Sequence, residues 1–267
     1  MLMNLIIAII AGWGAGVVTG LVGASAAVII TPMLVTFAGF DPFIAIGIAL
    51  ATDVFASGIS AYTYSKHGNI EVKKGMYLAI FAFIFAIVGS YLSTFIESSS
   101  LGNTSALITL LMGIRFLRKP LNESVAKMKE SNKFKFFQER PVFSSIFFGS
   151  IIGIICGFVG AGGGIMILLI LSLILGYEMK TAIGTSVLIM IFTAFAGAVA
   201  HFAIPYEAVG MDTTTQLMYT AVCVVTGLIG AKMAAKFANF ASEEKLNKVV
   251  GVTLTILGAV MVIQKWI

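Results

Sequence analysis

The sequence predicts an all-helical, polytopic membrane protein with about eight hydrophobic segments in two inverted repeats of four segments each. Composition, the length of the apolar stretches and an internal repeat predict this fold. Of 267 residues, 59% are hydrophobic and 11% are charged, and the mean hydropathy is +1.03. A single water-soluble core cannot hold so much apolar surface, so the solvent of this chain must be lipid.

The apolar stretches are long enough to cross a bilayer as helices. A helix needs roughly 20 residues to cross about 30 Å of hydrocarbon, whereas a membrane strand needs only about 9–11. The first stretch has no basic leader and no small-residue cleavage site, so we expect it to remain in the protein. The stretches cover residues 4–38, 43–63, 76–96, 101–117, 142–175, 181–204, 216–238 and 249–264.

A polar linker separates two similar halves. We predict a first transmembrane repeat at 1–117, a basic cytoplasmic linker at 118–140 and a second transmembrane repeat at 141–267. Several short motifs recur in the same order after a shift of 137 positions, which indicates a duplication. The shift places Gly157-Phe158-Val159-Gly160-Ala161 on Gly20-Leu21-Val22-Gly23-Ala24, Gly176-Tyr177-Glu178 on Gly39-Phe40-Asp41, and Ala182-Ile183-Gly184 on Ala45-Ile46-Gly47.

The first segment of each repeat is too long for one straight span. About 35 residues correspond to about 52 Å of helix, against a hydrocarbon core of about 30 Å. A glycine-rich break lies near each centre, at Gly20 and Gly23 in the first and from Gly157 to Gly164 in the second. Glycine lowers helix propensity and permits positive φ, so we expect two half-helices that re-enter the membrane.

The positions of Lys and Arg favour this re-entrant arrangement for residues 142–175. If that segment re-enters, sixteen of the 17 Lys+Arg lie on the cytoplasmic side and only Lys265 lies outside, as the positive-inside rule requires. Segment 43–63 then runs inward and segment 181–204 runs outward, which defines an inverted repeat typical of transporters. The first segment has no Lys or Arg, so its re-entrance is inferred from the repeat alone.

The glycine-rich break of the second repeat is a candidate anion site. Free backbone N–H groups at a helix start, with no side chains in the way, bind anions. The alternative is that these glycines only allow close helix packing. In the first repeat, Gly23 and Ser25 occupy the matching stretch, so we expect a two-sided site between the turns. The glycines of the second break are Gly160, Gly162, Gly163 and Gly164.

Four more polar residues inside the segments are candidates. The hydroxyls of Thr185 and Ser186 are expected to contact an oxyanion or to bond back to their own helix. Asp53 lies mid-span, where an acid is costly, so we expect a proton relay or gate, or a protonated carboxyl bonded to a neighbouring helix. His201 is expected either to respond to pH as a relay or gate, or to be solvated or capping near the external interface.

Several motifs together resemble the sulfite exporter TauE/SafE family of membrane permeases, over nearly the whole chain. The first repeat departs from the family pattern, because Ala24-Ser25-Ala26-Ala27 replaces the usual glycine run and Gly47-Ile48-Ala49 faces Gly184-Thr185-Ser186. This repeat is therefore expected to bind differently or less. The motifs are Gly157-Phe158-Val159-Gly160-Ala161-Gly162-Gly163-Gly164, Ala182-Ile183-Gly184-Thr185-Ser186, His201 and Gly210-Met211-Asp212.

The resemblance implies secondary transport of sulfite, sulfonates or related small sulfur anions, with proton coupling as one route. The first alternative is an anion channel. An intramembrane enzyme or scaffold is less favoured, because the spans lack paired carboxylates, an HExxH motif or a Ser/His constellation. We expect no enzyme activity, no cofactor, no metal and no nucleic-acid partner. The expected partners are a small anion and the bilayer, with a homodimer left open, and the expected location is the inner (cytoplasmic) membrane as a multi-pass protein.

Overall fold

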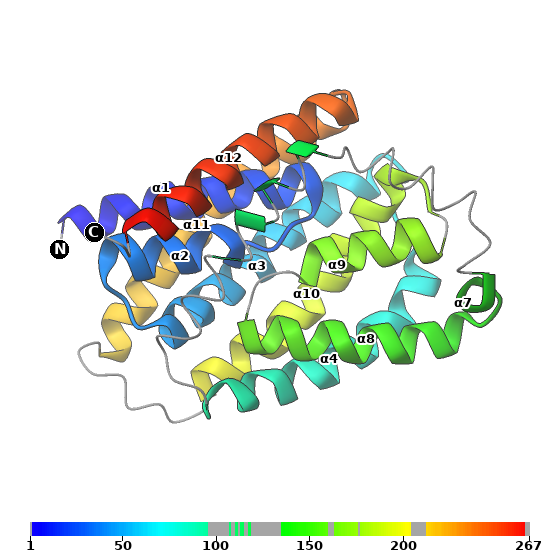
Figure 1. The fold of residues 1–267 in the computed structure, drawn as a ribbon, viewed down its shortest axis with the longest axis horizontal. Coiled ribbons are helices and arrows are strands. Elements are labelled where there is room, and N and C mark those ends of the chain that lie inside the picture. Colours follow the sequence, from blue (N-terminus) through cyan, green and yellow to red (C-terminus); the bar gives the residue numbers. More distant parts are fainter. Residues whose placement is uncertain are drawn as a thin grey trace.

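The computed structural model describes residues 2–95, 135–159, 163–175, 177–203 and 212–264, with a few isolated positions between 107 and 118. The regular elements of this described part are all helices (Figure 1). They are α1 (Leu2–Val22), α2 (Ala27–Ala38), α3 (Pro42–Ser65), α4 (Val72–Ser93), α7 (Lys135–Glu139), α8 (Pro141–Val159), α9 (Gly163–Leu169), the π-helix η2 (Ile170–Ile174), α10 (Met179–Ala203), α11 (Thr213–Ala238) and α12 (Glu243–Gln264).

Five of the described helices are long and apolar enough to cross a membrane, which confirms the predicted fold class. Shorter apolar helices accompany them at Ala27–Ala38 and Val142–Phe158. Large apolar side chains such as Phe55, Phe195 and Val225 are exposed on the outer faces, as lipid contact requires. The five candidate spans are Leu2–Val22, Pro42–Ser65, Gly75–Ser93, Lys180–Ala203 and Thr213–Ala238.

The first segment of each half is broken at its glycines, as predicted. Helix α1 ends directly before Gly23, whose φ is +67°, and α2 begins four residues later. Asn4 Nδ2 donates a hydrogen bond of 3.3 Å to the Ala38 carbonyl, so α1 begins where α2 ends. In the second half, α7 directly precedes α8 and contacts η2. Each broken pair therefore begins and ends at the same end of the bundle.

Close helix pairs join the two halves. Helix α1 packs most extensively against α11, and α8 packs against α4. A Cβ on Gly16 would lie 2.0 Å from the Gly227 carbonyl oxygen, and one on Gly157 would lie 2.0 Å from the Ala86 carbonyl oxygen. Glycine is required there because the backbones touch. The shift of 137 positions relates the two glycine stripes, Gly12, Gly16 and Gly20 on α1 and Gly149, Gly153 and Gly157 on α8.

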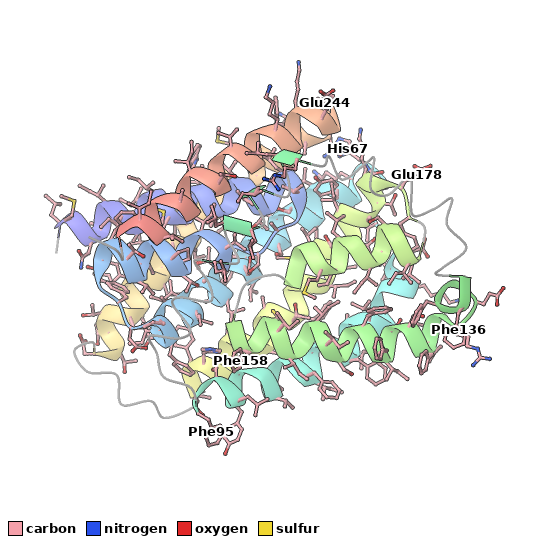
Figure 2. All side chains as sticks on the ribbon, viewed as in Figure 1. His67, Phe95, Phe136, Phe158, Glu178 and Glu244 are labelled. Carbon is pink, nitrogen blue, oxygen red and sulfur yellow. The ribbon has the colours of Figure 1, made fainter. Side chains whose placement is uncertain are left out.

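The helix ends form two groups. Figure 2 shows His67, Glu178 and Glu244 toward one end of the bundle and Phe95 toward the other. We call the first group the basic end, because several cations flank these helix ends. Lys180 Nζ donates to the Asn239 carbonyl over 3.1 Å, so the loops before α10 and after α11 meet there. The basic end holds Lys66, Arg140, Lys180, Lys236 and Lys245.

Two predictions about organisation remain predictions. The linker at 118–140 and the segment at 101–117 lie mostly outside the described residues, so the domain boundaries are not tested. The first helix of each half packs against a helix of the other half, α1 against α11 and α8 against α4. An inverted repeat would produce this pairing, but the symmetry itself stays a prediction.

Candidate functional site

The turn between α1 and α2 requires glycine at one position. Gly23, a predicted substrate-binding residue, adopts the left-handed conformation, and its amide donates to the Thr19 carbonyl over 2.9 Å. A Cβ at this position would lie 2.7 Å from Ser186 Oγ on α10. Gly23 is therefore required both by the turn and by the close approach of α10.

Asp53 on α3 reaches across to the start of α2. Its carboxylate accepts hydrogen bonds from the Ser25 hydroxyl and from the Ala26 amide, the latter over 2.6 Å. Asp53 is 1% exposed and is the one acidic residue within the five candidate spans. The N–H groups and the dipole at the start of a helix stabilise negative charge. The first turn therefore binds a carboxyl group that the protein itself supplies.

This geometry bears on the expectations for Asp53 and Ser25. The carboxyl group of Asp53 bonds to a neighbouring segment, as one alternative expected, and the contact with Ser25 has the same heavy-atom geometry whether the proton is on the serine or on Asp53, so both roles stay predictions. The Ser25 hydroxyl lies at the turn, as predicted, but it donates to Asp53. In this conformation the hydroxyl is engaged by the protein's own carboxylate.

The turn of the second repeat packs directly against the first. A Cβ on Gly164 would lie 2.1 Å from the Gly23 carbonyl oxygen and 2.3 Å from Met190 Sδ. Among the described residues, a Cβ on Gly163 would meet only Cys156, with its Sγ at 3.2 Å. Packing therefore explains Gly164, whereas Gly163 has more space. Gly160 and Gly162 lie outside the described residues.

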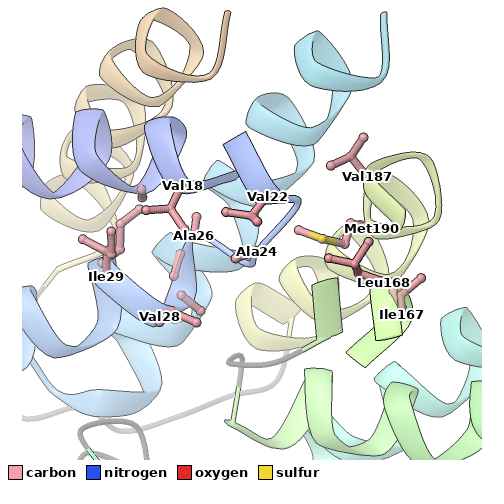
Figure 3. Close-up of a cluster of buried hydrophobic side chains, with 14 of the residues drawn as sticks. Val18, Val22, Ala24, Ala26, Val28, Ile29, Ile167, Leu168, Val187 and Met190 are labelled. Atoms are coloured by element: carbon pink, nitrogen blue, oxygen red, sulfur yellow. The ribbon is translucent and has the colours of Figure 1, made fainter. Parts of the chain in front are cut away.

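The two turns meet in the buried interior. Figure 3 shows Val22 and Ala24 of the first turn on one side, and Leu168 and Met190 on the other. Ala24 is 0% exposed and Met190 is 2% exposed, so this contact is shielded from solvent. The two turns thus meet at a junction of the two halves, and the role of this junction as a substrate site stays a prediction.

The two hydroxyls on α10 have different partners. Ser186 Oγ donates to the Ile183 carbonyl in its own helix over 2.8 Å. This is the second of the two expected roles, a bond back to its own helix. Its oxygen nevertheless lies next to Gly23 at the junction. Thr185 Oγ1 accepts a hydrogen bond of 2.9 Å from the Glu71 amide and so anchors the loop before α4. Ser186 lies at the predicted site, whereas Thr185 serves a loop contact.

His201 is buried, which contradicts the expectation of a solvated side chain. It is 4% exposed, and its ring stacks on Phe43 with centroids 4.3 Å apart. Nδ1 lies 3.0 Å from the Gly197 carbonyl oxygen, and within the described chain Nε2 has no hydrogen-bond partner. His201 lies in the last turn of α10, as predicted, but it packs on Phe43 of α3, so the solvated alternative is wrong and the relay or gate role stays a prediction. His201 is not adjacent to the junction of the turns.

The repeat register identifies residues that the motif search missed. Shifting Asp53 by 137 positions gives Met190, so a thioether occupies the position in the second repeat that holds the carboxylate in the first. The sequence contains this equivalence of Asp53 and Met190, because the shift that aligns the glycine motifs also aligns these two positions. Cys156, next to Gly163, carried no sequence signal because a buried cysteine is an ordinary core residue.

These features define the class of the protein. Two broken helices meet in a buried junction inside a bundle of membrane-spanning helices, and the start of α2 binds the carboxyl group of Asp53. Discontinuous helices with their ends directed at a central site are typical of secondary transporters. The fold and site thus define a polytopic membrane transporter.

Comparison with known proteins identifies the family. The family described as "Sulfite exporter TauE/SafE" matches residues 8–261, and the chain belongs to this family. The chain is 21% identical to the probable membrane transporter protein YunE of Bacillus subtilis (strain 168), with 98% of each chain covered. It is 24% identical to the probable membrane transporter protein YdhB of the same organism, over 92% of this chain and 95% of that protein.

A third relative extends the comparison to another organism. The chain is 25% identical to a probable membrane transporter protein of Xylella fastidiosa (strain 9a5c), over 99% of this chain and 97% of that protein. No solved structure matches. The family and these relatives make the protein a membrane transporter rather than an enzyme, as predicted.

Proposed function

We propose that the protein is a secondary transporter of a small sulfur oxyanion or organosulfonate, such as sulfite, in the cytoplasmic membrane, with protons as the coupling ion. The family name supports the substrate class. The substrate lies at the junction of the two turns, where Gly164 meets Gly23 and Gly23 meets Ser186. The other proposed substrate contacts are Gly160, Gly162, Gly163 and Ser25. Thr185 supports this site through the loop before α4.

The contact made by Asp53 carries the proposal. A carboxylate has the same charge and oxygen-acceptor chemistry as a small sulfur oxyanion, and it binds here to a hydroxyl and a backbone amide. The broken helices of this chain therefore have the donors that an oxyanion requires. Because the second repeat has Met190 in place of Asp53, its turn is the better place for an external anion.

Asp53 also supplies the coupling step. A proton on Asp53 removes its negative charge and converts one acceptor oxygen into a donor. If Oδ2 takes the proton, the Ser25 hydroxyl is released to donate to a substrate oxygen, while the Ala26 amide keeps Oδ1 of Asp53 as its acceptor. Anion entry becomes favourable only when Asp53 is neutral, since the bare carboxylate repels an anion in a low-dielectric interior. Proton and anion movement are linked in this way.

Transport by the purified protein in liposomes tests the proposal. The substrate panel contains sulfite, sulfate, thiosulfate and alkanesulfonates, with acetate and lactate as carboxylate controls. We expect saturable uptake of at least one sulfur anion, accelerated by an imposed pH gradient. Uptake of the carboxylates alone would reject the substrate class.

An anion channel is the second candidate, because both classes use the same donors. Planar-bilayer recordings separate them. A constant unitary conductance that does not saturate with substrate concentration would establish a channel, whereas electrically silent or small, saturating currents would establish a carrier.

A further inference from the structure

Helices α3 and α10 lie antiparallel, and they contact each other at both ends. Near the start of α3, a Cβ on Gly47 would lie 3.4 Å from His201 Cβ. Near the start of α10, a Cβ on Gly184 would lie 3.0 Å from Tyr64 Cβ. Between them, Gly197 packs on Leu50, with 3.0 Å between its ideal Cβ and Leu50 Cδ1. The Cβ atom of a ring-bearing residue thus contacts a glycine at each end of this helix pair.

The repeat register relates these two contacts. The shift of 137 positions that aligns Gly47 with Gly184 also aligns Tyr64 with His201. The glycine of each half therefore contacts the Cβ atom of the ring-bearing residue of the other half. Both rings are buried, with Tyr64 1% exposed and His201 4% exposed. Two unrelated packing contacts would not be expected at equivalent positions of the repeat. The Gly47–His201 and Gly184–Tyr64 contacts therefore indicate the same structural feature in each half.

Along α3, the Tyr64 and His201 rings lie on opposite sides of Asp53. Tyr64 follows Asp53 on α3 by eleven residues, or about 16 Å of helix, toward the basic end. His201 lies one turn from the end of α10, at the opposite end of the bundle, against Phe43 at the start of α3. Each ring thus fills the space beside α3 between one end of the bundle and Asp53.

The two ends differ in how firmly they are closed. The Tyr64 hydroxyl donates to the Gly20 carbonyl in the last turn of α1 over 3.2 Å, so this ring ties α1, α3 and α10 together. The equivalent carbonyl of the second half, on Gly157, accepts from Ser90 Oγ over 3.3 Å. At the opposite end His201 is held by stacking on Phe43 and by a bond within its own helix. Among the described residues, a hydrogen bond from one of these two rings to another helix is found at the basic end alone.

We infer that Tyr64 and His201 are the two gates of the transporter, and that the structure represents a conformation with the basic end locked by the Tyr64–Gly20 bond. This inference rests on the proposed transport function, since alternating access requires a gate on each side of the site. Opening the basic end requires this buried hydrogen bond to break, whereas opening the other end requires only that His201 leave Phe43.

The natural cysteines provide the test. Cys156 lies against Gly163 at the centre, and Cys223 is the other cysteine. In a Cys223→Ala background, Cys156 is the single thiol and reports whether a small impermeant thiol reagent reaches the centre. Right-side-out and inverted membrane vesicles present the two ends of the protein separately. No substrate is needed, so an error in the proposed substrate leaves this measurement unaffected.

We expect Tyr64→Phe, which keeps the ring and removes the hydroxyl, to raise the rate of Cys156 labelling from the basic end by roughly threefold to tenfold, the usual effect of losing one hydrogen bond. His201→Ala is expected to raise labelling from the opposite end only. Tyr62→Phe is the matched control, because this exposed tyrosine lies on the same helix two residues away, and it should change neither rate.

Folding is checked by the elution profile and melting temperature of each purified variant. If Tyr64→Phe folds normally and leaves labelling from the basic end unchanged, or raises it equally from both ends, the gate assignment is wrong. If Tyr64→Phe does not fold, Tyr64 is a structural residue and the assignment of the basic-end gate is equally wrong.

Discussion

A buried carboxylate determines how the first turn is built. Asp53 offers two acceptor oxygens, and the segment that opens α2 supplies one hydroxyl and one amide within reach. Without these donors a charged group at this depth would be strongly destabilising. Sequence alone indicated that Asp53 was unusual, because an acid inside an apolar span is rare. It did not identify the partner, since Ser25 is 28 positions away and belongs to a different helix pair.

Replacing Asp53 by asparagine tests the coupling role. The amide keeps the size of the side chain and one acceptor oxygen but cannot bind or release a proton in this range. We expect the transport rate of Asp53→Asn to vary little with pH, whereas that of the wild type falls as the proton concentration falls. Initial uptake rates between pH 5 and pH 8 measure this. An unchanged pH profile in a folded Asp53→Asn variant would leave Asp53 with a structural role only.

The two neighbouring glycines of the second turn separate binding from packing. Gly163→Ala places a methyl group against Cys156 at 3.2 Å, which a small shift accommodates, whereas Gly164→Ala places one 2.1 Å from a backbone oxygen. We therefore expect Gly163→Ala to fold and to weaken substrate affinity by about tenfold, by hindering amide contacts. Gly164→Ala should reduce the yield of folded protein. Equilibrium binding and thermal melting measure the two effects.

The opposite result for Gly163→Ala would move the site. If its affinity is intact while the amount of folded protein falls, then the second turn serves packing and the substrate lies nearer Ser186. Substitution by leucine cannot decide this point, because a side chain of that size would collide with Cys156 and damage folding by itself.

At the level of helices, glycine spacing decides which helices pair. The stripe on α1 and the stripe on α8 each allow a partner backbone to approach to contact distance. The broken first segments were predictable, because their length exceeded a single span and glycines marked the break. The partners of α1 and α8 were not predictable, since helix pairing in lipid depends on shape and no charge or motif encodes it. The bond from the Glu71 amide to Thr185 was not predictable either, because it depends on how the loop before α4 packs against α10.

Two glycines on α1 provide a matched test of this packing. Gly16 faces the backbone of α11, whereas a Cβ on Gly14 would have Ile29 Cγ2 as its nearest neighbour, at 3.8 Å. We expect Gly16→Ala to destabilise the protein by about 1–3 kcal/mol, the usual cost of overpacking. Gly14→Ala should be close to neutral. Melting temperatures in detergent compare the two, and equal destabilisation by both would show that α1 and α11 do not approach as described.

For the whole molecule, the two ends have different charge. The contact of Lys180 with Asn239, and that of α7 with η2, bring the loops of both halves to the basic end. The positive-inside rule then predicts that this is the cytoplasmic end. The sequence predicted this grouping from charge alone, because a re-entrant second segment was the one arrangement that put sixteen cations on one side. It could not predict how tightly the two turns pack, which depends on side-chain geometry.

Labelling in intact cells tests this orientation. In a background without cysteine (Cys156→Ala, Cys223→Ala), we expect Ser242→Cys and Ser65→Cys, both exposed at the basic end, to be protected from an impermeant thiol reagent until the cells are opened. Thr214→Cys, exposed at the start of α11, should react from outside without opening. If the bilayer separated Ser65 from Ser242, the end of α11 would have to lie on the side of the membrane opposite the end of α3. This fold does not allow that, because the Lys180–Asn239 bond holds the end of α11 at the basic end. Reaction of Ser242→Cys from outside together with protection of Ser65→Cys would therefore reject both the re-entrant second segment and the shared basic end. Reaction of both from outside, with protection of Thr214→Cys, would keep the fold and reverse its orientation in the membrane.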